Sequence, residues 1–165
     1  MGVGKSTLGK KIARRLNVPF IDSDNEIEKI HQKTIGEIFG EIGEIGFREI
    51  EMNFIDSLEK EKGFVLATGG GMPCFGNAME KLCTLGQTFY LKRSPKELMH
   101  RLINAKQKRP LIDGLSEEEL LIFIENKLEE RQEFYKQALF TLDRNEQNVD
   151  QFDKIIHLRQ FPQKS

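Results

Sequence analysis

The chain opens on a phosphate-binding signature, which limits the possible folds more than any other feature. Residues 2–7 read Gly-Val-Gly-Lys-Ser-Thr and run directly into a segment with helical periodicity. They match the right-hand part of the P-loop pattern G-x-x-x-x-G-K-[ST], in which glycines turn backbone N–H groups toward phosphate oxygens at a helix N-terminus. Lys5 then reaches the β- and γ-phosphates of ATP, and Ser6 holds Mg²⁺. The predicted nucleotide site comprises Gly2, Val3, Gly4, Lys5, Ser6 and Thr7.

The first glycine of this pattern falls two positions before Met1, and so does the strand that normally leads into such a loop. We therefore expect a fold that lacks its first strand and its first loop glycine, as if Met1 were an internal methionine. On its own, such a chain is expected to be insoluble or inactive. The alternative interpretation is a Gly-rich tail ahead of an ordinary helix.

Apolar and helical segments alternate along the rest of the chain, which is typical of a layered α/β fold. The pattern predicts strands at 18–21, 64–68, 88–91 and 138–142, helices at 6–16, 45–61, 94–103, 116–135 and 149–158, and loops at 40–46 and 104–115. The strand at 64–68 is continuously apolar and is expected to be buried on both faces. We predict a three-layer α/β/α fold with a parallel sheet, in a single domain covering residues 1–165.

Composition excludes several classes of partner. Lys and Arg number 25 and Asp and Glu 26, so the net charge is −1 and no global basic field exists to bind nucleic acid or an anionic membrane. No apolar run approaches the roughly 18 residues of a transmembrane helix, and the N-terminus lacks the apolar segment of a secretory signal. Cys74 and Cys83 match no metal or redox spacing. We expect a cytoplasmic monomer with reduced thiols.

Two carboxylates, Asp22 and Asp24, follow the first strand at the edge where α/β proteins bind ligands. Their i, i+2 spacing places both on one side of an extended segment, so one can hold Mg²⁺ while the other meets the substrate. The strand at 64–68 carries no Asp at its end, where other P-loop enzymes place a metal-binding acid. Asp22 is therefore the predicted acid near the metal. The alternative role for Asp24 is an N-cap of the next helix.

Three glycines, Gly69, Gly70 and Gly71, follow the strand at 64–68 directly. Because they have no side chains, a small polar substrate can lie against their backbone N–H groups. The alternative is a flexible turn without a binding role.

Two arginines lie on helix faces that are otherwise apolar. Arg131 continues a stripe that begins at Leu120, and Arg48 lies beside Ile55. A buried charge without a partner is costly, so each arginine needs an anion. That anion is either a structural Glu or a substrate carboxylate bound by two parallel hydrogen bonds.

A third arginine, Arg109, lies in a basic stretch with Lys106 and Lys108. Such stretches are usually solvated surface charge. Beside a P-loop, Arg109 could instead close over the transferring phosphate as part of a mobile lid at 104–115.

Six motifs, taken in order, resemble those of the shikimate kinases. They stand here as Gly4-Lys5-Ser6, Asp22-Ser23-Asp24, Phe47-Arg48, Gly69-Gly70-Gly71, Arg109-Pro110-Leu111 and Glu130-Arg131 with Tyr135. Each is weak alone, but together they span nearly the whole chain at intervals similar to those of the family. The resemblance implies a fold like that of the nucleoside monophosphate kinases. It also implies transfer of the ATP γ-phosphate to the 3-hydroxyl of shikimate, in aromatic amino-acid biosynthesis.

The resemblance implies roles on the substrate side. Asp24 would bind the ring hydroxyls and take the proton. Arg48 and Arg131 would hold the shikimate carboxylate, with the backbone of Gly69–Gly71 alongside. Phe39 and Phe47 would pack on the ring, and residues 34–61 would form the substrate-binding helices.

On the nucleotide side, the resemblance implies that Arg101 approaches the adenine. Asn148 belongs to a segment that loosely matches the adenine-side loop of the family. Lys5, Asp24 and Arg109 are then the catalytic residues, and Ser6 and Asp22 the metal-binding ones.

Two rival functions remain open at this stage. Another small-molecule P-loop kinase, acting on gluconate or a nucleoside monophosphate, shares the loop and the lid. Such an enzyme does not explain two arginines and three glycines beside Asp-x-Asp. The second rival is an inactive, truncated nucleotide-binding domain.

Overall fold

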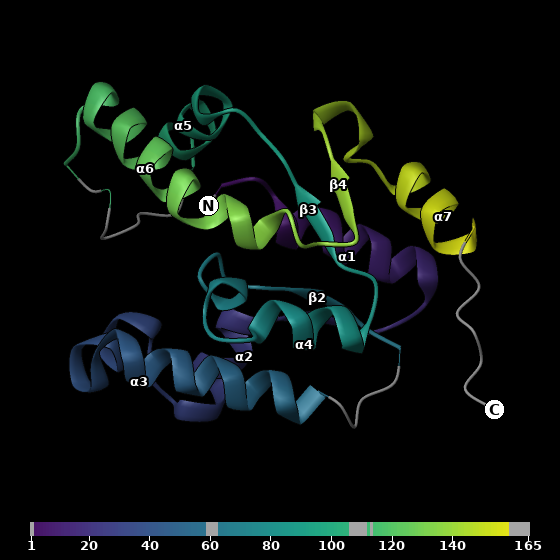
Figure 1. The fold of residues 1–165 in the computed structure, drawn as a ribbon, viewed down its shortest axis with the longest axis horizontal. Coiled ribbons are helices and arrows are strands. Elements are labelled where there is room, and N and C mark those ends of the chain that lie inside the picture. The colour runs from purple at the N-terminus through teal and green to yellow at the C-terminus, as the bar shows by residue number, and fades with distance from the viewer. Residues whose placement is uncertain (1, 59–62, 106–111, 113, 159–165) are drawn as a thin grey trace.

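The computed structural model describes residues 2–58, 63–105, 112 and 114–158 of the chain. In chain order the elements, with η for a 3₁₀ helix, are α1 (Lys5–Leu16), β1 (Phe20–Asp22), α2 (Ser23–His31), α3 (Ile35–Ser57), β2 (Val65–Ala67), η2 (Met72–Cys74), α4 (Ala78–Leu85), β3 (Phe89–Leu91), α5 (Pro95–Ile103), α6 (Glu117–Tyr135), β4 (Phe140–Leu142), η4 (Arg144–Glu146) and α7 (Val149–Leu158) (Figure 1). Strands alternate with helices, and the predicted α/β class is confirmed.

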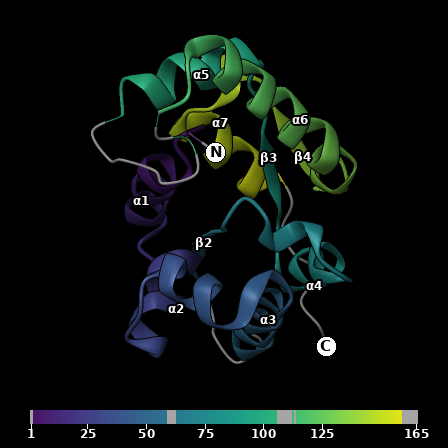
Figure 2. The same cartoon turned by 90° about the vertical axis from the view of Figure 1, so that its left-hand side faces the viewer.

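The four strands form two parallel pairs. β1 pairs with β2, with Ile21 opposite Leu66, and β3 pairs with β4, with Tyr90 opposite Thr141. Within the described part of the chain, no strand joins the two pairs (Figure 2). Helix α1 packs on β1, β2 and α7, while α4 connects β2 to β3. The predicted parallel sheet is therefore present as two half-sheets.

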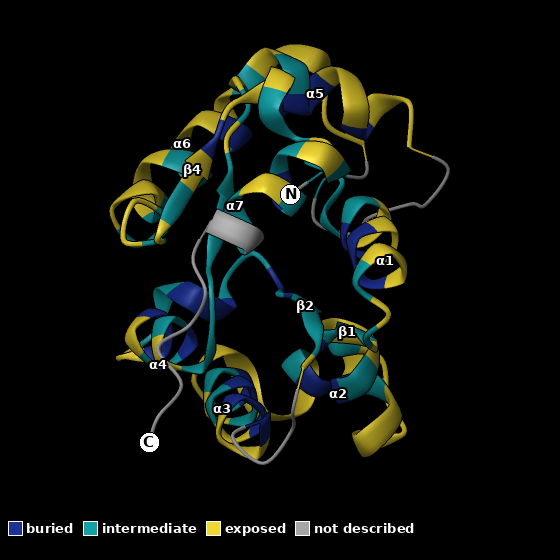
Figure 3. Ribbon diagram, turned by 90° about the vertical axis from the view of Figure 1, so that its right-hand side faces the viewer, coloured by how far each residue is buried: buried dark blue, intermediate teal, exposed yellow. Residues whose placement is uncertain are grey.

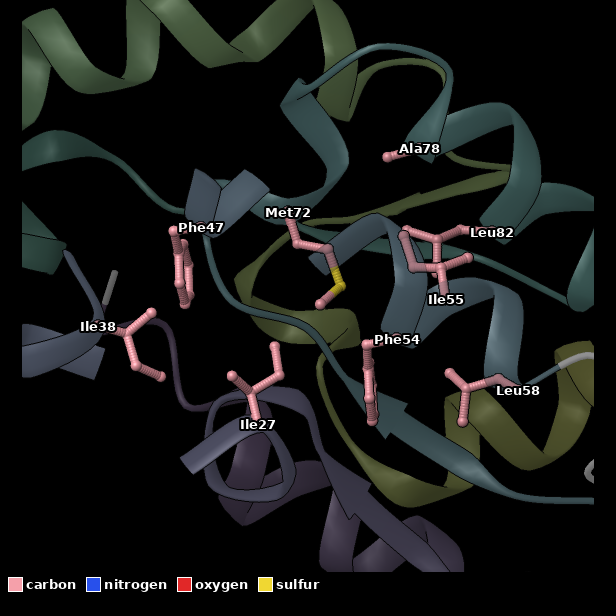
Figure 4. Packing of buried hydrophobic residues seen from close by; sticks show 9 residues of the cluster. All are labelled: Ile27, Ile38, Phe47, Phe54, Ile55, Leu58, Met72, Ala78 and Leu82. Atoms are coloured by element: carbon pink, nitrogen blue, oxygen red, sulfur yellow. The ribbon is translucent and has the colours of Figure 1, made fainter. Parts of the chain in front are cut away.

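Three clusters of buried side chains form the core. The largest joins α2, α3, η2 and α4 and consists of Ile27, Ile38, Phe47, Phe54, Ile55, Leu58, Met72, Ala78 and Leu82 (Figure 4). A second joins α5 to α6 and includes Val3, so the phosphate loop packs against these helices. The third joins α1, β4 and α7 through Ile12, Leu142 and Phe152. Together they hold the phosphate loop and the residues after β1 and β2 near one another.

Helix starts agree with the sequence wherever capping residues mark them. Thr34, Ser94 and Ser116 each accept a hydrogen bond from the backbone three residues on, and a Glu at that position returns one. These reciprocal bonds satisfy backbone N–H groups that the first helical turn leaves free.

The segment around 40–46 differs from its prediction. The expected loop is helical, and α3 runs through it with one break at Gly43, whose φ is 69° and ψ −175°. The three glycines at 40, 43 and 46 suggested a loop, but Ile38 and Phe47 on either side of them pack in the core cluster, and the chain between them is helical. Ile30 of α2 is 63% exposed. Helix α4 had no counterpart in the prediction.

The strand at 64–68 is also less enclosed than expected. Val65 and Leu66 are only half-buried, as are all three residues of β3 (Figure 3). The reason is that, among the described residues, one edge of β2 and one edge of β3 have no neighbouring strand. None of the described helices is long and apolar enough to cross a membrane.

Candidate active site

The phosphate loop ends at Gly4, which caps α1 in the left-handed conformation with φ 97°. Only glycine adopts this conformation readily, so the tight entry into α1 depends on it. Arg101 of α5 covers the loop, because its Nε donates a hydrogen bond to the Gly2 carbonyl oxygen at 2.7 Å. A Cβ on Gly4 would lie 2.9 Å from the Arg101 guanidinium. Arg101 therefore lies beside the phosphate loop.

Two oxygen ligands meet at the metal side of the loop. The Ser6 hydroxyl donates a hydrogen bond to Asp22 Oδ2 at 2.6 Å. Mg²⁺ prefers few protein oxygens and completes its shell with water and substrate phosphates, so a hydroxyl and one carboxylate suit it. Within the described residues there is no group of three or more acidic, His or Cys side chains that could hold a metal alone. The donor set therefore fits a magnesium ion that arrives with a nucleotide.

Asp24 lies in a different local structure from the one expected. β1 ends at Asp22 and α2 begins at Ser23, so Asp24 belongs to the first turn of α2 and not to an extended segment. It does not cap the helix either, because Asp22 holds the N-cap position. Although the residue as a whole is exposed, desolvation of its carboxyl group raises its pKa, and the nearby Asp22 adds to the rise. The charge of Lys5 opposes both effects.

The three glycines pass between the groups expected to bind substrate. The Gly69 N–H donates to Ser23 Oγ at 2.8 Å, and the Tyr135 hydroxyl donates to the Gly70 carbonyl oxygen at 2.6 Å. A Cβ on Gly69 would lie 2.6 Å from Asp24 Oδ1, and one on Gly71 would overlap the Arg48 guanidinium. A side chain at either position would displace Asp24 or Arg48, so the glycines leave room for these two charged groups.

Arg48 lies beside this glycine loop with its side chain 11% exposed. Its Nη1 donates to Glu51 at 2.6 Å and its Nη2 to Glu44 at 2.9 Å. Burial alone would lower its pKa, but the hydrogen bonds and charges of Glu51 and Glu44 outweigh burial and raise it. Phe39 and Phe47 pack with their rings tilted by 36° at a centroid separation of 4.5 Å, and the guanidinium lies 5.9 and 5.7 Å from their centroids. The structural Glu that the sequence left as an alternative is therefore present.

Glu51 is a site residue that sequence reasoning missed. Its side chain is 3% exposed, and desolvation raises its pKa, although Arg48 and Arg131 act in the opposite direction. The sequence did offer a signal for Glu51. It lies three positions after Arg48 on the same helix, and residues at that spacing are neighbours on a helix surface. Glu44 is different, because its side chain is 69% exposed and can give up Nη2 at little cost.

Arg131 approaches the same place from α6. Desolvation raises the pKa of Glu51 and of Cys74, and the charge of Arg131 opposes both rises, so Arg131 lies near both groups; it also hydrogen-bonds with Tyr135. Desolvation raises the pKa of Tyr135 to about 12, which keeps its hydroxyl protonated and able to donate to Gly70. Two arginines, from α3 and α6, thus lie beside the glycine loop.

The remaining predicted residues are placed less tightly. Thr7 is exposed on the first turn of α1. Asn148 accepts from the Gln151 N–H at 3.0 Å and donates to the Asn145 carbonyl at 3.0 Å, so the structure shows it in the turn before α7. Arg109 and most of the segment 104–115 lie outside the described residues.

Comparison with known proteins agrees with this geometry. The family model described as shikimate kinase matches residues 1–159. The chain belongs to the shikimate kinase family. A shikimate kinase of Bacteroides fragilis is 45% identical over 96% of this chain and 93% of its own. One from Flavobacterium psychrophilum is 34% identical over 94% of each chain.

Solved shikimate kinases share the fold. The crystal structure of the enzyme from Bacteroides thetaiotaomicron superposes with a TM-score of 0.91 at 42% identity, covering 95% of this chain and 94% of the other. The enzyme of Acinetobacter baumannii, solved in complex with shikimate, gives a TM-score of 0.79 at 35% identity over 96% and 87% of the two chains. The predicted P-loop kinase fold and the predicted family are both confirmed.

Proposed function

We propose that this chain transfers the γ-phosphate of ATP to the 3-hydroxyl of shikimate, giving shikimate 3-phosphate and ADP. The observation that carries the proposal is the pair Arg48 and Arg131. Arg48 lies against Gly71 of the glycine loop, and both arginines act on Glu51 from two different helices. Two guanidinium groups, with the Asp24 carboxylate against Gly69 of the same loop, suit a ligand with one carboxylate and several hydroxyls. The A. baumannii relative was solved with shikimate bound, which supports this choice.

The substrate roles follow from the contacts. Arg48 is held by Glu51 through Nη1, while its Nη2 contacts only the exposed Glu44, so a substrate carboxylate can replace Glu44 there. Arg131 would complete the clamp. Phe39 and Phe47 would pack on the ring, and the glycine loop would lie along it.

The reaction then needs a base and phosphate-binding groups. The 3-hydroxyl oxygen attacks the γ-phosphorus, the bond between that phosphorus and the β–γ bridging oxygen breaks, and ADP leaves. Asp24 takes the hydroxyl proton, since its raised pKa brings it nearer the pH at which a carboxylate is an efficient base. Lys5 stabilises charge on the transferring phosphate, and Arg109 is proposed to close over it.

We also propose that Ser6 and Asp22 hold Mg²⁺, and that Gly2, Val3, Gly4 and Thr7 surround the ATP phosphates. When bound, the ion neutralises negative charge on the β- and γ-phosphates. Arg101 covers the loop and is proposed to approach the adenine, with Asn148 on the same side of the nucleotide. We further propose that the enzyme works in the cytoplasm as a monomer.

A coupled assay of ADP release with shikimate, gluconate and nucleoside monophosphates tests the proposal. We expect ATP to be converted to ADP only when shikimate is the acceptor. Turnover on gluconate or a nucleoside monophosphate, and none on shikimate, would assign another small-molecule kinase. Calorimetric titration with shikimate and an ATP analogue distinguishes an active kinase from an inactive nucleotide-binding domain. The inactive domain would bind these ligands without turnover or would not bind them.

A further inference from the structure

A fully buried hydroxyl lies between the two carboxylates that follow β1. Ser23, the first residue of α2, is 0% exposed, and it and Glu51 are the buried polar or charged residues of the described chain. A hydroxyl that has lost its contact with water needs hydrogen-bond partners within the protein. The motifs give Ser23 no role beyond separating Asp22 from Asp24, so its burial calls for an explanation.

The Ser23 hydroxyl joins the end of β1 to the end of β2. Its Oγ accepts a hydrogen bond from the Gly69 N–H at 2.8 Å, across 46 positions of the sequence. Backbone pairing of the two strands ends at Asp22 opposite Ala67. Ser23 follows at once, so its side chain continues the contact between the two segments beyond the paired strands.

The same hydroxyl also lies beside the Asp24 carboxylate. Ser23 Oγ donates to Asp24 Oδ1 at 3.4 Å, which is a long hydrogen bond, so the Gly69 N–H is the stronger of the two partners. Asp24 Oδ1 is itself close to Gly69, because a Cβ added to that glycine would lie 2.6 Å from it. A hydroxyl can accept one hydrogen bond and donate another. Gly69, Ser23 and Asp24 thus form one chain of contacts from the glycine loop to the carboxylate.

The distance between the glycine loop and Asp24 matters for the proposed reaction. The substrate lies along the loop, and Asp24 must reach the proton of one of its hydroxyls. A general base acts only within hydrogen-bond distance, and a misplacement of about 1 Å can cost about 10²-fold in rate. The loop and the first turn of α2 are distant in sequence, so noncovalent contacts set the distance between them. The hydrogen bond from Gly69 to Ser23 is such a contact, directly beside the base.

We propose that Ser23 is a positioning residue for phosphoryl transfer. It holds the glycine loop at a fixed distance from α2 and thereby keeps Asp24 within reach of a hydroxyl on the bound substrate. Ser23 itself touches no substrate, because it is fully buried. The proposal rests on the proposed function, since Ser23 acts through Asp24 as the base.

Ser23→Ala removes the hydroxyl, and Thr88→Val is the matched control. Thr88 Oγ1 also accepts a backbone N–H from a distant segment, that of Leu139 at 3.0 Å, but its segment directly before β3 carries no residue of the predicted site. Both variants leave a backbone N–H without its acceptor, so both should melt at a lower temperature. We expect only Ser23→Ala to lower kcat, by about tenfold or more, with the Kd for ATP unchanged within about twofold.

The double variant Ser23→Ala with Asp24→Asn separates positioning from a structural role. If Ser23 acts through Asp24, its loss should change kcat by less than about twofold once the base is absent. Normal kcat in Ser23→Ala, or the same loss of kcat with and without Asp24, would overturn the proposal. Should Ser23→Ala fail to fold, Ser23→Cys keeps a side chain of similar shape with a weaker acceptor, and the same comparison is made with it.

Amide hydrogen exchange of Gly69, followed by nuclear magnetic resonance, measures the contact without any turnover. Ser23→Ala should speed the exchange of this amide about tenfold or more, because the N–H loses its acceptor. Absence of turnover on shikimate in the unmodified chain would contradict the proposed function. Unchanged Gly69 exchange in Ser23→Ala would contradict the role of Ser23 alone, so the two failures are distinguishable.

Discussion

At the residue scale, the site depends on charges held where water is scarce. Arg48 and Glu51 have side chains 11% and 3% exposed and lie 2.6 Å apart. A buried ion pair of this kind offsets a desolvation cost and is not in itself a strong source of stability. The ion pair instead fixes the position of the Arg48 side chain. Glu51 binds Nη1, and the guanidinium is held beside Gly71 of the glycine loop.

Arg48→Ala should weaken shikimate binding far more than ATP binding. Loss of charge-assisted hydrogen bonds of about 1.5–3 kcal/mol corresponds to roughly tenfold to a few hundredfold in Kd. Arg48→Lys should recover only part, since an ammonium cannot form the two-pronged contact. Calorimetric titration measures both ligands, with Arg15→Ala, which breaks an exposed pair to Asp153, as the control. Equal losses of ATP and shikimate affinity would show that Arg48 does not bind the substrate.

Asp24→Asn should keep nucleotide binding and lower turnover by about 10²-fold or more, since it removes the base. The raised pKa means that the folded state binds the Asp24 proton more tightly than the unfolded state. Above its folded pKa, the ionised Asp24 carboxylate therefore destabilises the folded state. Asp24→Asn replaces that carboxylate by a neutral amide, so it should not lower the melting temperature at neutral pH. Steady-state kinetics and thermal melting measure the two effects, and near-normal turnover would remove Asp24 from the mechanism.

At the element scale, helices present the site residues and a few backbone positions set their angles. α3 carries Phe39, Phe47 and Arg48, and its break at Gly43 divides these residues between two helical segments. α6 brings Arg131 and Tyr135 to the glycine loop. The position of each arginine thus depends on how one helix is kinked or anchored.

Gly43→Ala should lower stability by about 1–3 kcal/mol, because φ 69° with ψ −175° belongs to a region that side chains hardly adopt. Gly40→Ala is the matched control. It is helical with nothing within 4 Å of an added Cβ, and it should raise stability by about 0.5–1 kcal/mol. Urea unfolding of the two variants measures the contrast. Stabilisation of both variants would mean that α3 is not broken at Gly43.

Tyr135→Phe should loosen the glycine loop. It removes the hydrogen bond to the Gly70 carbonyl oxygen and should cost about 1–2 kcal/mol of stability. We expect KM for shikimate to rise while kcat changes little, since Tyr135 positions the loop and does not touch the reacting atoms. Tyr90→Phe, whose ring lies 5.1 Å from that of Tyr135, serves as the control. An unchanged KM would show that the loop holds its shape without α6.

The features that were predicted correctly from the sequence are those that depend on residues close together in the chain. Capping boxes at Ser94 and Ser116 are local signals, and the helices beginning there were predicted correctly. Gly43 misled because glycine marks both loops and helix breaks, and only tertiary packing decides between them. Glu51 was missed because burial of a charge opposite Arg48 depends on α2, β2 and α3 meeting in space.

At the scale of the whole molecule, the site lies where the two half-sheets and the helices around them converge. β1 delivers Asp22, β2 leads into Gly69, and α1 presents Lys5 and Ser6. α3 and α6 then add the two arginines. These parts come from distant stretches of the chain, so the site requires the complete fold.

The central claim is that this site phosphorylates shikimate at one hydroxyl, and ³¹P nuclear magnetic resonance of the product tests it most directly. The protein is incubated with shikimate, ATP and Mg²⁺. We predict one new phosphomonoester signal, coupled to the proton at carbon 3 of shikimate, formed in step with ADP and reduced in Asp24→Asn and Arg48→Ala. ADP formed with inorganic phosphate alone, or phosphate on another hydroxyl, would contradict the account.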